Sequence, residues 1–216
     1  MLKLPVVLEM GGVVVGAVSG GIHAVNRQAD IIGIFVLAFL TALGGGIVRD
    51  VFIGAGTPLA LARPAYLIVV GGASLVTLCL ASWLARFTRL LVVLDAFLMG
   101  LWTVMGTERA FAYGLPVMST IFLGTVTATG GGMLRDVVSG ESPQVLKKGE
   151  LHVTAALIAA SLDAILIRSL TLPPLVGQMT TVAVAAGIRL GAIRWHVTAP
   201  APSDVNELWR RWRRRG

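Results

Sequence analysis

The chain has 216 residues, of which 56% are hydrophobic and only 13% are charged, and its formal net charge is +7 at pH 7. Soluble domains carry about a quarter charged residues, so this composition excludes an ordinary soluble protein and indicates one that lies in lipid. Much of the basic excess is in residues 209–215 (WRRWRRR), which is typical of a cytoplasmic anchor at anionic lipid and not of a nucleic-acid site, because no soluble domain remains to carry one.

Seven apolar stretches follow one another, and each is long enough to cross a bilayer core of about 30 Å, or nearly so, as a helix. The first has no clear cleavage site after it and matches a later stretch, so we interpret it as a membrane span and not as a signal peptide. The sequence therefore predicts an all-α polytopic membrane protein forming one membrane domain. Its predicted transmembrane helices are residues 4–25, 31–52, 64–84, 90–112, 116–138, 151–167 and 172–193.

The second and fifth stretches contain nearly the same motif, GGGIVRD at residues 44–50 and GGGMLRD at residues 130–136. At the same offset of 86 positions, Glu9 matches Asp95 and Gly54 matches Gly140; after one deletion, Pro58 matches Pro143. Such an internal repeat predicts two copies of a three-helix unit. The expected segments are repeats at 4–87 and 88–170, a seventh helix at 171–195 and a basic tail at 196–216.

A unit of three helices starts and ends on opposite sides of the membrane, so the second copy is predicted to be inverted, as in many transport proteins. The positive-inside rule then orients the chain, because one predicted side is richer in basic residues. We expect the N-terminus outside and the C-terminus in the cytoplasm. The richer side holds Arg27, Arg86, Arg89, Lys147, Lys148 and the tail; the other holds Lys3, Arg63, Arg109 and Arg168.

Two glycine triplets lie inside predicted spans: Gly44, Gly45, Gly46 and Gly130, Gly131, Gly132. Each glycine weakens a helix by about 1 kcal/mol, so a triplet favours a kink or an unwound turn whose carbonyls need burial or water. Two broken helices meeting near the midplane could bind and pass small cations. The alternative is close helix packing, which is also the better explanation for the four-residue spacing of Gly12, Gly16 and Gly20.

An arginine and an aspartate follow each triplet: Arg49 and Asp50, then Arg135 and Asp136. Charges at membrane depth cost roughly 2.5 kcal/mol or more, so they tend to pair or to face water. Because adjacent residues on a helix point in different directions, we predict crossed pairs, Arg49 with Asp136 and Asp50 with Arg135. They would form a lock between the repeats or an electrostatic element at the pore mouths.

Five further polar residues are candidates for lining a pore: Glu9, Asp95, Thr41, Thr127 and Thr129. Acidic residues in a span favour a water-lined path and attract cations, and threonine hydroxyls could add oxygens to its wall. The acids could instead act as caps or lie at an interface, and the threonines could bond back to their own helices.

Other chemistry is not indicated. Cys79 is the only cysteine, the three histidines do not cluster, and neither a Ser/His/Asp set nor a phosphate loop is present, so we expect no enzyme activity, no cofactor and no metal beyond a permeant monovalent cation. Asp163 and Arg189 match no residue in the other repeat and lie near the ends of predicted spans, where we interpret them as interfacial.

With its paired GGG-x-x-RD motifs and seven spans, the sequence resembles the prokaryotic trimeric intracellular cation channel family, also catalogued as a two-copy glycine-transporter-like domain. The resemblance covers residues 5–195. It implies a homotrimer in the prokaryotic inner membrane, in contact with lipid. Each protomer would hold a hydrophilic pore for potassium or sodium, lined by the second and fifth helices, with kinks at residues 44–46 and 130–132. Glu9 stands where we would expect aspartate, as at Asp95.

An alternative function is a secondary transporter for a small zwitterion such as glycine. Half-helix N-termini could hold the carboxylate, and Glu9 or Asp95 could hold the amine. Inverted repeats suit alternating access as well as a fixed pore, so the repeat does not decide between the two.

Overall fold

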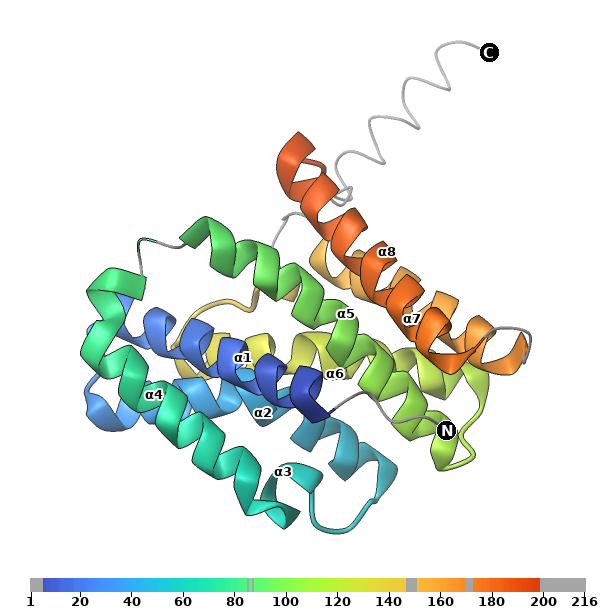
Figure 1. The fold of residues 1–216 in the computed structure, drawn as a ribbon, viewed down its shortest axis with the longest axis horizontal. Helices are drawn as coiled ribbons and strands as arrows, with labels where there is room; N and C mark the ends of the chain where they lie inside the picture. Colours follow the sequence, from blue (N-terminus) through green and yellow to red (C-terminus); the bar gives the residue numbers. More distant parts are fainter. Residues whose placement is uncertain (1–5, 85, 87, 147–150, 170–172, 199–216) are drawn as a thin grey trace.

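The protein is seen in a computed structural model that describes residues 6–84, 86, 88–146, 151–169 and 173–198. Most of these residues are helical (Figure 1). The elements are α1 (Val6–Asn26), α2 (Ile31–Ile53), α3 (Leu59–Ala62), α4 (Pro64–Leu84), α5 (Thr88–Ala112), α6 (Val117–Val138), the 3₁₀ turn η2 (Gln144–Leu146), α7 (His152–Ser169) and α8 (Pro174–Trp195).

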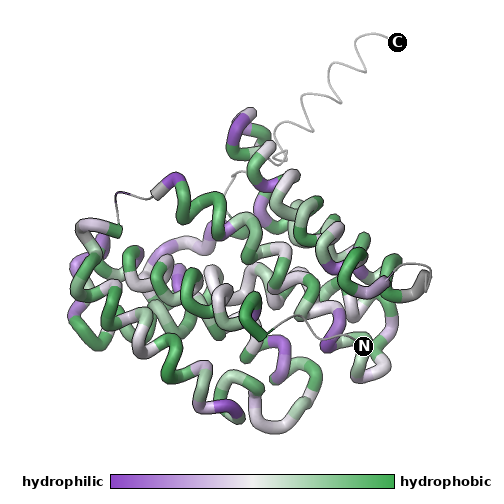
Figure 2. The backbone as a smooth tube through the Cα atoms, viewed as in Figure 1, coloured by the Kyte–Doolittle hydropathy of each residue, from purple (hydrophilic) through white to green (hydrophobic). Residues whose placement is uncertain are grey.

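The long helices match the predicted spans, with ends that differ by a few residues. Six of them, all but α7, contain a stretch long and apolar enough to cross a membrane; α7 contains a shorter apolar stretch, His152–Ile167. Hydrophobic residues cover the helices and hydrophilic segments gather at several helix ends (Figure 2). The chain is therefore an all-helical polytopic membrane protein. Most of the predicted basic tail lies outside the described residues.

Local sequence explains where the helices begin and end. The Asp30 carboxylate accepts a 2.7 Å hydrogen bond from the Gly33 N–H at the start of α2, as an N-cap does. Gly54 ends α2 at φ 69°, in the left-handed region that favours glycine. Proline stands at the first position of α4 and of α8, where its missing N–H costs nothing. The capping residues and prolines therefore determine where the helices end and the connecting loops begin.

The helices form two groups that meet at one crossing. In the first group α1 packs on α2 and α4, in the second α5 packs on α6, α7 and α8, and the chief contact between the groups is α2 against α6. The groups repeat the same detail: a Cβ added at Gly20 would lie 2.4 Å from the Thr41 hydroxyl, and one at Gly106 would lie 2.6 Å from the Thr127 hydroxyl. Glycine is thus required where α1 crosses α2 and where α5 crosses α6.

Asp163 is buried in the second group, and the prediction that it is interfacial is wrong. Only 1% of the residue is exposed, and its carboxylate accepts hydrogen bonds from the hydroxyls of Thr107 on α5 and Thr181 on α8, the latter 2.9 Å long. The sequence interpretation failed because α8, which covers this part of α7, has no counterpart in the repeat. The hydroxyl donors satisfy a carboxylate that would otherwise be costly inside a membrane bundle.

Candidate functional site

The two glycine triplets meet where α2 and α6 cross. A Cβ built on Gly45 would lie 2.1 Å from the Thr127 carbonyl oxygen, and one built on Gly131 would lie 2.5 Å from the Thr41 carbonyl oxygen. Both atoms belong to the backbone, which cannot move aside cheaply. Residues later in α2 contact residues earlier in α6, so the helices run in opposite directions here. The middle glycine of each triplet therefore permits the backbones to touch.

The helices continue through both triplets, since α2 and α6 are each one uninterrupted helix. The prediction of an unwound turn with bare carbonyls is wrong for this reason. The contacts at Gly45 and Gly131 show the alternative, close helix packing. The backbone of the neighbouring helix occupies the space that a side chain at either position would need. A kink at the triplets stays a prediction.

The last glycine of each triplet faces open space. A Cβ on Gly132 would meet nothing within 4 Å, and one on Gly46 would meet only the Arg49 guanidinium, at 3.9 Å. Both glycines line cavities, which we call the wide cavity and the narrow cavity. In each triplet, therefore, the middle glycine lies in a helix contact and the last glycine lines a cavity.

The wide cavity has a volume of about 330 Å³ and reaches the last turn of α1, at His23 and Asn26. Polar side chains from several helices line it, including the predicted residues Thr41, Asp95, Thr127, Thr129, Arg135 and Asp136, together with His152 and Arg189. Thr41, Thr127 and Thr129 donate their protons to carbonyls of their own helices over 2.6 to 2.9 Å. Their hydroxyl oxygens keep acceptor capacity, which suits a cation more than an anion.

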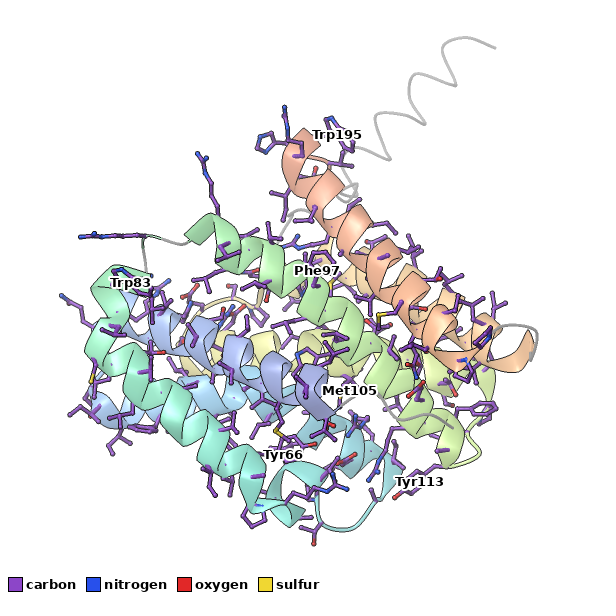
Figure 3. All side chains as sticks on the ribbon, in the orientation of Figure 1. Tyr66, Trp83, Phe97, Met105, Tyr113 and Trp195 are labelled. Carbon is purple, nitrogen blue, oxygen red and sulfur yellow. The ribbon has the colours of Figure 1, made fainter. Side chains whose placement is uncertain are left out.

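The narrow cavity has a volume of about 30 Å³ and lies toward the opposite end of α1, at Glu9. The Glu9 carboxylate accepts a hydrogen bond from the Tyr66 hydroxyl on α4, and Arg49 lines the same space. The Met105 carbonyl oxygen accepts a 3.4 Å hydrogen bond from Arg49, and Figure 3 labels both Tyr66 and Met105. The two matched acids, Glu9 and Asp95, therefore lie in different cavities.

Each arginine pairs with the aspartate that follows it, so the predicted crossed pairs are wrong. Arg49 Nε lies 3.0 Å and its Nη2 2.9 Å from Asp50 Oδ1, and in the second repeat Arg135 Nε lies 3.0 Å and its Nη2 2.7 Å from Asp136 Oδ1. Adjacent side chains do leave a helix in different directions, but the arginine chain is long enough to fold back at the last turn. The pairs lie within repeats and not between them.

The second oxygen of each aspartate holds the next short turn of chain. Asp50 Oδ2 accepts a 2.8 Å hydrogen bond from the Leu59 N–H at the start of α3, and Asp136 Oδ2 accepts a 2.9 Å bond from the Gln144 N–H at the start of η2. Sequence reasoning missed both short turns. The matched prolines, Pro58 and Pro143, were the available signal, because proline often precedes or opens a helical turn.

Within the described part of the chain, charged contacts also join the repeats at both ends of the bundle. Arg109 of α5 lies 3.6 Å from Asp50 at the end of α2. At the opposite end, Glu141 after α6 forms an ion pair with Arg27, and its carboxylate lies 3.2 Å from the His23 Nε2 atom of α1. Apart from Asp50, these residues were not among the predicted site residues, although Arg109 follows His23 by the repeat offset of 86 positions. The charged connections between repeats thus come from the ends of α1 and α5.

The chain is similar to membrane proteins of one family. It matches the family model described as "Glycine transporter" twice, over residues 6–82 and 92–168. The UPF0126 inner membrane protein YadS of Escherichia coli is 32% identical over 194 residues, which cover 89% of this chain and 93% of that protein. A UPF0126 membrane protein of Vibrio cholerae is 33% identical over 204 residues, covering 89% of this chain and 80% of that protein.

Solved structures with the same fold include two cation channels. A TRIC channel studied for the structural basis of its conductance aligns with a TM-score of 0.86 and 29% identity, covering 92% of this chain and 97% of that one. The TRIC trimeric intracellular cation channel orthologue from Rhodobacter sphaeroides aligns with a TM-score of 0.81 and 32% identity, covering 89% of this chain and 98% of that one.

Proposed function

The chain belongs to the prokaryotic trimeric intracellular cation channel family, also catalogued as UPF0126, and from that membership we propose that it is a cation channel of the inner membrane. The observation that carries the proposal is the pair of cavities toward opposite ends of α1, which both contain charged side chains in their linings and share lining residues of α2 and α5. A path through both cavities would pass carboxylates and hydroxyl oxygens at Glu9, Asp95 and Thr129, which suits a small monovalent cation such as potassium.

The repeats would be inverted in the membrane. Antiparallel contacts of α2 with α6 support this, as do the equivalent arginine–aspartate caps at Asp50 and Asp136. The repeats would comprise residues 4–87 and 88–170, with a seventh helix at 171–195 and a basic tail at 196–216. With the N-terminus outside, the wide cavity would open toward the cytoplasm, on the side richer in basic residues.

The protein would work as a homotrimer, with one pore in each protomer. The Rhodobacter sphaeroides relative, described as a trimeric channel, supports this assembly, since it covers nearly the same length of chain. Within each protomer the pore would be lined by α2 and α6. Arg49, Asp50, Arg135 and Asp136 would fix the charges at its two mouths and stabilise the turns that follow.

A transporter for a small zwitterion such as glycine is the second candidate, and the description of the matching family model favours it. The wide cavity has the groups such a substrate would need, a carboxylate at Asp95 and a guanidinium at Arg189. It would then operate by alternating access and would carry no unitary currents.

Recording from a planar bilayer separates the two candidates. We expect discrete unitary currents in potassium chloride without added amino acid, with a reversal potential that follows the potassium gradient. Gly132→Phe should abolish them by filling the wide cavity, whereas Gly187→Phe, at an exposed glycine of α8 with open space beside it, should leave them. Saturable uptake of labelled glycine without unitary currents would favour the transporter.

A further inference from the structure

Among the residues that the structure describes, three line both cavities: Ala42, Gly46 and Trp102. Of these, only Trp102 has a side chain larger than a methyl group. It lies on α5, is partly buried, and packs against the core of the first group. The boundary between the two cavities is therefore formed largely by one indole.

The two cavities differ about tenfold in volume. Since each water needs at least about 10–15 Å³, the narrow cavity holds at most about two or three waters and the wide one at most about 22 to 33. A hydrated cation that enters the wide cavity must therefore shed most of its water before it reaches Glu9. The step in width occurs at Trp102.

The repeats differ at the position of the indole. Gly12 and Gly16 of α1 correspond, 86 positions later, to Leu98 and Trp102 of α5. A Cβ on Gly12 would lie 3.2 Å from Leu98 Cδ2 and 3.4 Å from Trp102 Cζ2, so the indole rests over a glycine. A Cβ on Gly16, which lines the wide cavity, would lie 3.0 Å from the Ala42 Cα atom, so this glycine lets α1 approach α2. Leu98 and Trp102 both line the wide cavity, and of the two Trp102 alone also reaches the narrow cavity.

We propose that the Trp102 indole is the constriction of the conduction path and sets both its unitary conductance and the largest cation that passes. The inference rests on the proposed channel function. Gly12 is the positioning residue, because a methyl group there would push the indole further into the path. Removal of the indole would join the two cavities into one continuous hollow.

The test compares Trp102→Ala with Phe97→Ala in planar bilayers. Phe97 lies on the same helix with 43% of its surface exposed, and Figure 3 labels it. We expect Trp102→Ala to raise the unitary potassium conductance at least about twofold and to admit N-methyl-D-glucamine, which the wild type would exclude. Phe97→Ala should match the wild type in both respects.

A second pair keeps the test decisive if Trp102→Ala does not assemble. Gly12→Ala should lower the unitary conductance, while Gly11→Ala, where a Cβ meets nothing within 4 Å, should not. If Trp102→Ala has the wild-type conductance and still excludes the large cation, this inference is overturned while the channel proposal stands. If Trp102→Ala does not assemble, equal conductance of Gly12→Ala and Gly11→Ala overturns the inference in the same way. No unitary current from the wild type and Phe97→Ala would overturn the channel proposal and this inference with it.

Discussion

The two halves of the molecule share a charged framework and differ in what fills the space between. Both end their glycine-rich helix with an arginine folded onto the next aspartate, and both aspartates hold the following turn. Yet the wide cavity, beside Gly132, is about ten times as large as the narrow cavity, beside Glu9. The comparison shows that two repeats can keep the same stabilising charged contacts while side chains of different size give them cavities of different volume.

The largest expected effect comes from the more deeply buried framework pair. Asp50→Asn would leave the guanidiniums of Arg49 and Arg109 without their carboxylate, and breaking a buried pair costs about 3–5 kcal/mol. Asp136→Asn removes the partner of Arg135 alone, whose side chain is 13% exposed, so its cost should be smaller. Denaturant unfolding in detergent measures both free energies; equal losses would contradict this difference between the halves.

A double-mutant cycle in the same assay distinguishes pairs within a repeat from crossed pairs. Arg49→Met and Asp50→Asn should be coupled by about 1–3 kcal/mol, whereas Arg49→Met and Asp136→Asn should add within about 0.5 kcal/mol. Strong coupling in the second combination would restore the crossed arrangement.

A smaller loss is expected at the shared crossing. Gly131→Ala places a Cβ 2.5 Å from the Thr41 carbonyl oxygen, and such overpacking typically costs about 1–3 kcal/mol. Gly132→Ala is the matched control, because its methyl group enters open space and alanine favours the helix by about 1 kcal/mol. The apparent melting temperature should fall in the first variant and hold or rise in the second. A similar melting temperature in both would show that the triplets are not closely packed.

The smallest effect belongs to the exposed connection between the repeats. Glu141 pairs with Arg27, whose side chain is 54% exposed, so Glu141→Gln should cost less than about 1 kcal/mol. Because salt screens exposed charges, the difference from wild type should vanish near 1 M salt, while that of Asp50→Asn should persist. If the loss of stability in Glu141→Gln persists at 1 M salt, the Glu141 contacts stabilise the protein in the same way as the buried Asp50 pair, which contradicts the prediction.

The helices could be predicted because lipid demands long apolar stretches, and the repeat offset identified the charged framework. The consequences of the glycines could not be predicted in the same way. The same glycine triplet is compatible with an unwound turn and with close helix packing. The α6 backbone that contacts Gly45 distinguishes the two, and the sequence does not show that contact.

The charge pairing failed for a related reason. The sequence gives the spacing of Arg49 and Asp50 but not the direction in which a long side chain folds. The short turns α3 and η2 span four and three residues, too few for any periodicity to show. The repeat offers a signal for Arg109, which aligns with His23, but none for Glu141, which aligns with Ala55.

The central claim is that the two cavities open to opposite sides of the membrane and meet between α2 and α5, at Trp102. In a Cys79→Ser background, Leu59→Cys and Gln144→Cys place thiols at equivalent turns beside the two cavities. An impermeant maleimide applied to sealed vesicles of known orientation should label them from opposite faces. Labelling of both from one face would contradict the account.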